Sequence, residues 1–313
     1  MPVPMIDVVA IGILVADFFP DPIQRLPAQG ELMLVDGVAL STGGCAANTA
    51  VALTKLGKKA SVVGKVGNDV FGRFITEDLG RKGIDVSQIV RTATEDTSKT
   101  IILPVRGEDR RYLHQTGANS DLRLDDVDLV CLDRARAVYV GGYLGMPQFG
   151  PQDLATVLQH ATNKGLFTAL DVIVSETARH LSDLMPVLPF VDAFMPNEDE
   201  ARLLTGEVEP EKQADVFLDA GAKTAVITIG AGGALAKSGT ETIRLEAYSV
   251  PFLDGSGAGD AFTGGFLSAI LDAKPLEYAL KLGSAMGASC VRKLGCSAGL
   301  FTQQQADDLI REE

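Results

Sequence analysis

Apolar residues along the chain fall into two alternating patterns. Short runs rich in β-branched residues are typical of buried strands, and longer segments with apolar residues three or four positions apart are typical of helices. From residue 137 onward the two patterns follow one another regularly, which predicts a parallel sheet covered by helices. The predicted strands are 8–15, 33–40, 61–66, 100–105, 111–115, 137–140, 167–171, 193–196 and 224–229, and the predicted helices are 46–56, 71–81, 153–164, 199–205, 260–272 and 277–293.

The early part of the chain departs from this alternation. Residues 18–30 contain three prolines and lose helical spacing, so no helix is expected directly after the first strand. The runs 100–105 and 111–115 are separated by turn-forming residues, which predicts a hairpin. A second hairpin-like segment covers 233–245. The early strands are therefore expected to lie outside the main α/β winding.

The composition is that of a folded enzyme and disfavours several partners. Apolar residues make up 46% and charged residues 22% of the 313 positions, which fits neither a disordered nor a collagen-like chain. The net charge of −13 disfavours nucleic acid and anionic membrane surfaces as partners. The apolar start lacks a basic region and no run is long enough to span a bilayer, so we expect a cytoplasmic protein.

The cysteines and histidines form no recognisable metal-binding pattern. The cysteines are scattered without a CxxC pair and are expected to be free thiols, mostly buried. Three histidines leave little material for a His-rich metal site or a His-based triad. The cysteines are Cys45, Cys131, Cys290 and Cys296.

The glycine-rich segment 254–260, DGSGAGD, is the strongest candidate for chemistry. Gly257, Ala258 and Gly259 place small residues at the first turn of a predicted helix, where unpaired backbone N–H groups can receive an anion. A carboxylate at Asp260 would repel that anion, so its position makes sense if it orients and deprotonates an attacking hydroxyl. A helix cap explains the same residues equally well.

Two stretches together resemble the signatures of the ribokinase-like (PfkB) carbohydrate kinase family. GAGD, with Asp254 three positions before it, resembles the second signature, and residues 42–72, with paired glycines and Asn48, resemble the first. The resemblance spans nearly the whole chain and implies a single α/β domain, 1–313: a three-layer α/β/α sandwich with a mainly parallel central sheet and a small β-sheet lid from about 17–40 and 100–115. It also implies ATP-dependent phosphorylation of a sugar hydroxyl, in particular a primary CH2OH group, with Asp260 as general base.

Further matches imply a site for ATP and Mg²⁺. Asn197 and Glu200 fit the family's NxxE element, in which Glu200 would act on Mg²⁺ through water; Mg²⁺ favours oxygen ligands and retains waters. Without the resemblance, Asn197 is simply a helix N-cap followed by acidic residues. The stretch AVITIGAGGALA resembles the nucleotide-binding strand and turn of these kinases. The residues implied for ATP are Asn197, Thr228, Gly230, Gly232, Gly233 and Ser284.

The resemblance also implies a monovalent cation, K⁺, beside the anion hole. Its ligands would come from Asp254 and Ser256 and from backbone oxygens near Cys290, Lys293 and Gly295. Two positions depart from the family pattern. Gly255 stands where the family often has Thr, and Gly299 stands where a Ser ligand can occur.

Asp17, Gly43, Gly44 and Asn48 are the residues that the resemblance assigns to the sugar, because carboxylates and amides can pair with vicinal hydroxyls. Val15 and Cys45 stand where ribose-specific members carry Asn and Lys, and no Glu occurs within 141–145. These departures do not favour ribose. A nucleoside kinase and a non-catalytic sugar-sensing protein on the same fold remain alternatives, and homodimerisation through the lid is a further expectation. A dehydrogenase is disfavoured because the first strand lacks GxGxxG.

Overall fold

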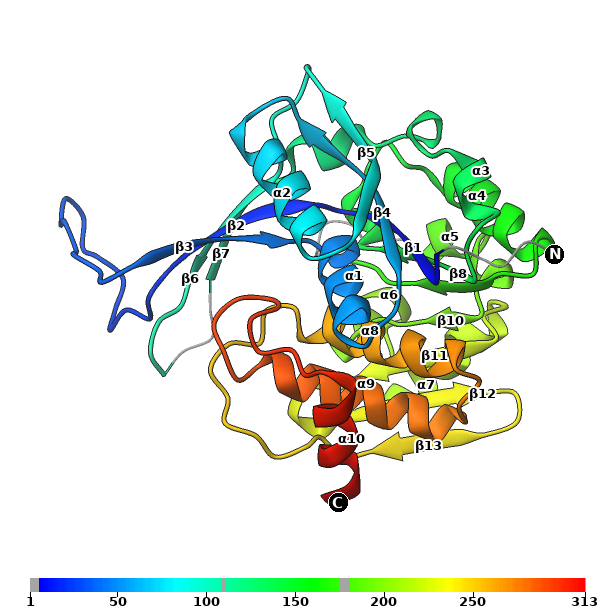
Figure 1. The fold of residues 1–313 in the computed structure, drawn as a ribbon. Helices are drawn as coiled ribbons and strands as arrows, with labels where there is room; N and C mark the ends of the chain where they lie inside the picture. Colours follow the sequence, from blue (N-terminus) through cyan, green and yellow to red (C-terminus); the bar gives the residue numbers. More distant parts are fainter. Residues whose placement is uncertain (1–5, 108–110, 175–180, 313) are drawn as a thin grey trace.

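The computed structural model describes residues 6–107, 111–174 and 181–312. Figure 1 shows its elements. The strands are β1 (Val8–Gly12), β2 (Val15–Pro20), β3 (Val38–Gly43), β4 (Ala60–Gly67), β5 (Asp85–Thr92), β6 (Lys99–Leu103), β7 (Arg111–Gln115), β8 (Ala137–Gly141), β9 (Phe167–Leu170), β10 (Ala193–Phe194), β11 (Thr224–Thr228), β12 (Ala234–Ser238) and β13 (Thr242–Leu245). The α-helices are α1 (Cys45–Lys55), α2 (Val70–Arg81), α3 (Leu129–Leu132), α4 (Pro151–Asn163), α5 (Leu181–Leu184), α6 (Glu198–Thr205), α7 (Pro210–Asp219), α8 (Ala258–Leu271), α9 (Leu276–Cys290) and α10 (Gln303–Glu312).

Nine strands form the main sheet in the order β13-β12-β11-β10-β9-β8-β1-β4-β5. The seven strands from β11 to β5 run parallel to one another, and β12 and β13 add an antiparallel edge. From β1 the chain winds outward through β4 and β5, and then continues on the other side of β1 through β8. The loops at the carboxyl ends of the strands diverge around β1, which is where open α/β sheets form their binding crevices.

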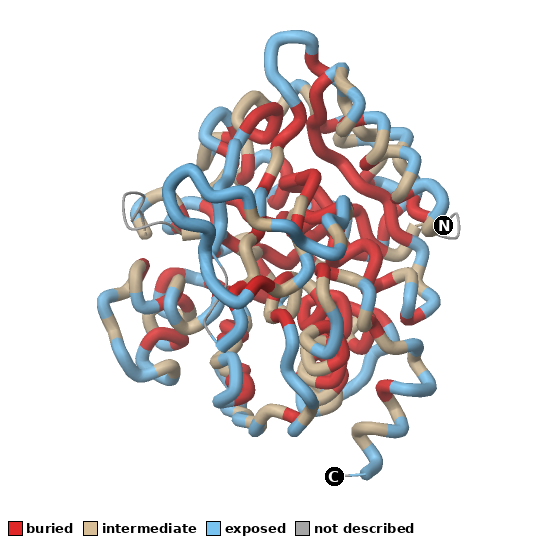
Figure 2. The backbone as a smooth tube through the Cα atoms, turned by 90° about the vertical axis from the view of Figure 1, so that its left-hand side faces the viewer, coloured by how far each residue is buried: buried red, intermediate tan, exposed pale blue. Residues whose placement is uncertain are grey.

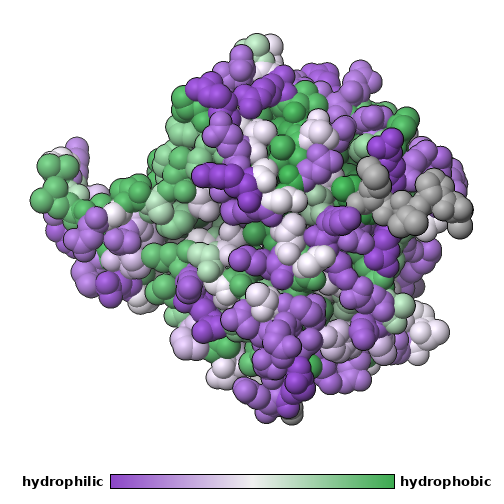
Figure 3. All heavy atoms as spheres, in the orientation of Figure 1, coloured by the Kyte–Doolittle hydropathy of each residue, from purple (hydrophilic) through white to green (hydrophobic). Residues whose placement is uncertain are grey.

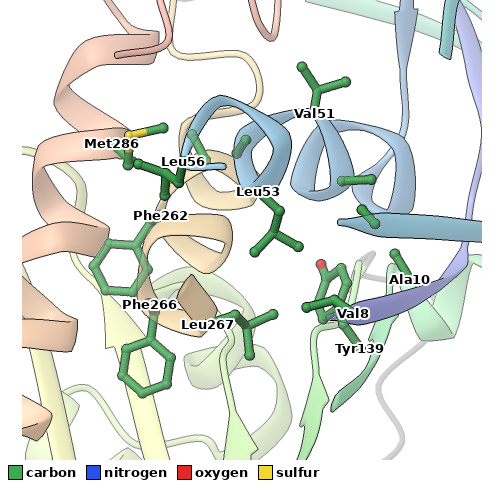
Figure 4. Packing of buried hydrophobic residues seen from close by; sticks show 14 of the residues in the cluster. Val8, Ala10, Val51, Leu53, Leu56, Tyr139, Phe262, Phe266, Leu267 and Met286 are labelled. Atoms are coloured by element: carbon green, nitrogen blue, oxygen red, sulfur yellow. The ribbon is translucent and has the colours of Figure 1, made fainter. Parts of the chain in front are cut away.

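Helices cover both faces of this sheet, as the alternation of side chains along β1 requires. Val8 and Ala10 pack into one cluster with α1, α2, α8 and α9, whereas Val9 and Ile11 pack into a second cluster with α4, α6 and α7. Figure 4 shows Val8 and Ala10 beside Leu53 of α1 and Leu267 of α8. The buried backbone lies in the centre of the molecule (Figure 2). Among the described residues, no helix is long and apolar enough to cross a bilayer.

A separate four-stranded sheet, in the order β3-β2-β6-β7, projects from one side of the molecule (Figure 1). Its strand pairing puts Phe18, Leu40, Ile101 and Leu113 on one face, called here the outer face. The opposite, inner face carries Asp17, Thr100 and His114, and Thr100 Oγ1 lies 3.0 Å from His114 Nδ1. This sheet therefore presents a polar inner face and an apolar outer face.

The architecture agrees with the implied ribokinase-like fold, but two predicted strands have wrong limits. The predicted strand 8–15 is two strands, because the chain leaves the main sheet after Gly12 and enters the small sheet at Val15. The predicted strand 33–40 begins only at Val38, because 31–35 pairs with no strand among the described residues; Leu34 is 87% exposed. The pattern did not predict β5, α3, α5, α7 or α10. Residues 108–110 of the expected lid lie outside the described residues.

Candidate active site

The glycine-rich turn 254–257 leads directly into the first turn of α8. Gly257 is the N-cap with φ 76°, and a Cβ there would lie 2.7 Å from Cys296 Cβ, so only glycine fits without a shift. Within the described part of the chain, the N–H groups of Gly259 and Asp260 donate no hydrogen bond. A Cβ on Gly259 would have open space around it. The start of α8 therefore has the free donors and the clearance that an anion requires.

Asp260 is held beside these donors by α1. Asn48 Nδ2 donates to Asp260 Oδ2 at 2.8 Å, and Thr49 Oγ1 donates to the main-chain oxygen of Asp260 at 3.2 Å. Asn48 is only 4% exposed. Burial raises the pKa of Asp260, and hydrogen bonds from Asn48 and Cys45 partly oppose that rise. Asn48, a residue of the first signature that is predicted to bind the substrate, thus positions Asp260, the predicted base.

The inner face of the small sheet contributes Asp17, which is 6% exposed. Burial raises the pKa of Asp17 to about 7, against hydrogen bonds from Thr100 and Cys296, and the charges of Asp260 and Asp254 add to the rise. A Cβ at Gly43 would lie 1.8 Å from Asp17 Oδ2, so this glycine makes room for the carboxylate.

Gly44, the N-cap of α1, has φ 95° and approaches the main-chain oxygen of Ile13. It therefore starts the helix that carries Asn48. The four residues assigned to the sugar come from β2, from the end of β3 and from the start of α1. Asn48 contacts Asp260 directly, and Gly43 lies against Asp17.

Asp171 and Cys45 complete the floor of this site, and neither was among the predicted site residues. The Cys45 Sγ and one carboxylate oxygen each of Asp171 and Asp260 lie within 4.8 Å of one another. Tyr139 Oη donates to Asp171 Oδ2 at 3.2 Å, and the Val172 N–H donates to Oδ1 at 2.7 Å.

Burial, followed by the charges of Glu200 and Asp260, raises the pKa of Asp171 well above its usual value. Burial also raises the pKa of the Cys45 thiol, which is therefore neutral. The sequence did contain a signal for Asp171, because an aspartate directly follows a buried strand at the carboxyl edge of the sheet.

Asn197 and Glu200 form a capping box at the start of α6. Asn197 Oδ1 accepts from the Glu200 N–H at 2.9 Å, and Glu200 Oε2 accepts from the Asn197 N–H at 3.0 Å. Burial raises the pKa of Glu200 to about 7 against the hydrogen bond from Asn197, and the charge of Asp260 adds to this rise. The helix-cap interpretation of Asn197 is correct, and the same arrangement brings Glu200 toward Asp260.

The predicted nucleotide turn lies next to this cap. Thr228 ends β11 and forms an isolated parallel bridge with Asn197. Gly230 and Gly233 have φ 55° and 91°, and a Cβ at Gly233 would lie 1.9 Å from the main-chain oxygen of Leu245. Gly232 lies within the same turn. Ser284 comes from α9, which packs against β12 and β13 beyond the turn.

The residues predicted for a monovalent cation are also gathered by the fold. Asp254 Oδ1 accepts from the Ser256 N–H at 2.9 Å, and Oδ2 accepts from the Gly295 N–H at 3.0 Å. Cys290 Sγ donates to the main-chain oxygen of Ser256 at 3.2 Å, and the Lys293 N–H donates to the main-chain oxygen of Cys290 at 3.4 Å. Among the described residues, no group forms a hydrogen bond with the buried Ser256 hydroxyl, so this oxygen is available to a cation.

Gly299 explains one departure from the family pattern. A Cβ at this position would lie 2.4 Å from the main-chain oxygen of Ser289. A serine therefore does not fit here unless the backbone shifts, and position 299 cannot supply a side-chain ligand. The cysteines are free thiols as expected, with Cys45, Cys290 and Cys296 buried.

The site lies at the carboxyl ends of parallel strands and combines a helix start that has free N–H groups with an adjacent carboxylate, an arrangement that suits phosphoryl transfer. The chain belongs to the pfkB family of carbohydrate kinases, whose family model matches residues 5–303. It is 30% identical over 287 residues to a ribokinase of Haemophilus influenzae, covering 90% of this chain and 91% of the relative. It is also 30% identical over 310 residues to a 2-dehydro-3-deoxygluconokinase of Bacillus subtilis, covering 96% and 94%.

The fold has close structural counterparts. A ribokinase of Arabidopsis thaliana, solved with ribose and ATP, superposes with a TM-score of 0.83 at 23% identity and covers 98% of this chain and 99% of its own. At that identity the likeness concerns the fold. The protein is a carbohydrate kinase, and the two curated relatives act on different sugars according to their names, so relatedness alone does not select the acceptor.

Proposed function

We propose that the protein transfers the γ-phosphoryl group of ATP to a hydroxyl of a sugar, in particular a primary CH2OH group. The observation that carries this proposal is the placement of the Asp260 carboxylate beside the unpaired N–H groups at the start of α8. A base next to an anion site has a clear use when a hydroxyl attacks phosphorus.

The acceptor would be held by Asp17, Gly43, Gly44 and Asn48. Its attacking hydroxyl would donate its proton to Asp260, which Asn48 orients at 2.8 Å. Negative charge on the transferred group would be stabilised at the turn 257–259 by the start of α8, through the free N–H groups of Gly259 and Asp260 and the positive end of the helix dipole. The Ala258 N–H, expected to belong to this anion hole, instead donates to the main-chain oxygen of Gly255 at 3.2 Å. Asp17 lies on the inner face of the small sheet, so we propose that this sheet acts as a lid that excludes water from the reaction.

The nucleotide is assigned to the other side of the site. Thr228, the glycines of 230–233 and Ser284 would border ATP, and Asn197 with Glu200 would hold hydrated Mg²⁺. The oxygen donors and the partly exposed Glu200 carboxylate fit this ion, which supplies charge neutralisation on the phosphates. K⁺ would be held at the loop of Asp254 and Ser256, where the orphan Ser256 hydroxyl offers a ligand.

Asp260→Asn tests the central assignment. We expect the variant to fold and to bind ATP by calorimetry, while turnover measured by coupled ADP release falls by about 10² or more, the scale of general-base catalysis. Asp272→Asn, at the opposite end of α8, is the matched control and should retain turnover. Near-normal turnover of the Asp260 variant would remove Asp260 from this role.

A nucleoside is the second candidate acceptor. Ile13 and Ile173 lie within contact distance of a Cβ built at Gly142, and this apolar surface offers a place for a base. ADP release measured against pentoses, hexoses, keto-deoxy acids and nucleosides separates the two. A preference for nucleosides would reverse the order, and ATP binding with no turnover of any acceptor would indicate a sugar-sensing protein.

Two properties of the whole protein accompany this proposal. Use of ATP fits a cytoplasmic location. The apolar outer face of the small sheet suits a homodimer.

A further inference from the structure

The loop that follows α9 contacts the small sheet at two neighbouring positions. Cys296 Sγ donates a hydrogen bond to Asp17 Oδ2 across 3.7 Å, and both side chains are buried. A Cβ at Gly295 would lie 3.0 Å from Phe19 Cζ, so the ring of Phe19 lies directly against this glycine. Asp17 and Phe19 are alternate residues of β2 and therefore lie on the same inner face. Residues 295–296 are thus a point where the main body meets the inner face of the small sheet.

The same two residues are anchored to the segment that contains the predicted reaction centre. The Gly295 N–H donates to Asp254 Oδ2 at 3.0 Å. Cys296 Cβ occupies the space that Gly257 leaves free, because a Cβ at Gly257 would lie only 2.7 Å from it. Since the main chain of 295–296 is held from this side, the Cys296 thiol is a fixed donor beside Asp17.

The Cys296 thiol keeps its proton and therefore acts toward Asp17 as a neutral donor. Burial, followed by the charge of Asp17, raises the pKa of Cys296 well above its usual value. Asp17 Oδ2 is enclosed between this thiol and Gly43, where a Cβ would lie 1.8 Å from the oxygen. A carboxylate is planar, so a contact that fixes Oδ2 also fixes Oδ1. The thiol and the Thr100 hydroxyl use two of the about four acceptor positions of the carboxylate and leave capacity for a sugar hydroxyl.

We propose that Cys296 is a positioning residue that holds the Asp17 carboxylate in the orientation in which it binds a hydroxyl of the acceptor sugar. This inference rests on the proposed function, which assigns Asp17 to the acceptor. Without the thiol, the carboxylate is freer to rotate about its Cβ–Cγ bond, and acceptor binding then has to restrict that rotation. ATP is assigned to the other side of the site, so its binding should not depend on Cys296.

Cys296→Ala removes the donor, and Cys296→Ser replaces it by a hydroxyl. Binding is measured by calorimetry at about pH 8.5, where Asp17, with a pKa of about 7, is ionised. The probe is the sugar of the acceptor panel that has the lowest wild-type Kd. We expect Cys296→Ala to raise this Kd about fivefold or more and to leave the Kd for ATP unchanged. Cys296→Ser should recover most of the loss. Cys131→Ala makes the same change in α3 and should alter neither Kd.

A thiol that acts through Asp17 has no effect once that carboxylate is removed. In an Asp17→Ala background, Cys296→Ala should therefore change the acceptor Kd by less than about twofold. An effect as large as in the wild-type background, or an equal effect on the Kd for ATP, would overturn the positioning role and indicate a general loss of packing.

The Asp17 carboxyl resonance of the ligand-free protein, followed by NMR as pH is changed, gives a test without binding or turnover. The thiol donor favours the ionised carboxylate. The titration midpoint should therefore rise in Cys296→Ala and stay at or below the wild-type value in Cys296→Ser. An unchanged midpoint in the alanine variant would overturn the inference even in an active kinase.

The other groups that face Asp17 are the same in every variant of this comparison. They are the charges of Asp254 and Asp260 and the Thr100 hydroxyl, which is hydrogen-bonded to His114. A wild-type protein that turns over no sugar of the panel would sink the proposed function, while the midpoint would still decide whether the thiol orients Asp17. If the alanine variant does not fold, a midpoint above the wild-type value in the serine variant would overturn the inference.

Discussion

Asp17 and Glu200 both lie in surroundings that disfavour an ionised carboxylate, and neither position in the sequence reveals this by itself. Burial is the main cause that raises the pKa of each to about 7, and the neighbouring Asp260 charge adds to it. Local sequence placed Asp254, Gly257 and Asp260 together because they are adjacent along the chain. Asp171 could not be assigned in that way, because its proximity to Asp260 depends on how β9, α1 and α8 converge.

A dependence of stability on pH follows from these carboxylates. A carboxyl group whose pKa is higher in the folded than in the unfolded state stabilises the fold at low pH, and this contribution is lost as pH rises. For Asp17 the loss runs from about pH 4, the unfolded value, to about pH 7, the folded value. We expect the Tm of the ligand-free protein to fall by roughly 5 °C or more between pH 5 and pH 8.

Asp17→Asn isolates this effect, because an amide keeps the shape and does not titrate in this range. Differential scanning calorimetry should show a flatter pH profile for this variant, whereas Asp36→Asn, at an exposed position in the loop before β3, should keep the wild-type slope. A variant profile as steep as that of the wild type would show that Asp17 is not the titrating group.

Turnover should change with pH in the opposite direction to stability. Asp260 accepts a proton only when ionised, and burial raises its pKa, so kcat/KM should increase as pH rises through the acidic range.

At the scale of elements, α8 and α9 are held close by glycines. A Cβ at Gly265 would lie 2.6 Å from the Leu282 main-chain oxygen and 2.9 Å from Gly283 Cα. We therefore expect Gly265→Ala to destabilise the protein by about 1 to 3 kcal/mol through overpacking. Urea denaturation followed by circular dichroism measures the change.

Gly80→Ala in α2 is the matched control, because the nearest atom to its Cβ would be Val86 Cγ2 at 3.9 Å. Alanine is the better helix former, so this variant should gain about 0.4 to 1 kcal/mol. If Gly265→Ala lowers the free energy of unfolding and Gly80→Ala raises it, the destabilisation at Gly265 comes from the contact between α8 and α9. A neutral or stabilising Gly265→Ala would contradict that contact.

The elements that sequence predicted well are those whose pattern is set by burial on one face. α2 and α4 were predicted within a few residues, because their apolar stripes face the sheet. α8 was predicted as closely, although it is buried on nearly all sides. β5 was missed because intermediate burial weakens its alternation. α7 was missed although Pro210 at its first position and Glu211 in its first turn are signals of a helix start. The early strand was wrong at 13–14, since only the fold shows that the chain changes sheets there.

At the scale of the whole molecule, the small sheet exposes apolar surface. Figure 3 shows hydrophobic residues gathered on the projecting part of the molecule. Val38 is 65% exposed, Ile101 45% and Leu113 63%. Together with Phe18 and Pro20 they line a hollow on the outer face. The ring of Phe71 in α2 makes an edge-to-face contact with the ring of Phe18. Apolar residues gathered in this way are typical of interaction surfaces.

A homodimer in which two outer faces pack together would cover this surface, and Leu113→Glu tests it. The substitution places a charge where the interface would exclude water, so we expect the dimer Kd to increase at least about tenfold. Sedimentation velocity over a range of concentrations measures this change. Because Leu113 is exposed, the variant should keep the Tm of the wild type at a concentration where both are monomeric.

Val130→Glu, at a position 67% exposed on α3, introduces the same charge far from the outer face and should leave the Kd unchanged. A wild-type protein that stays monomeric at all concentrations would contradict the dimer. An unchanged Kd in Leu113→Glu would move the interface elsewhere. In a dimer formed through the outer faces, each inner face with Asp17 would stay directed at the active site of its own subunit. Association would therefore stiffen the small sheet without adding residues to the active site of the other subunit.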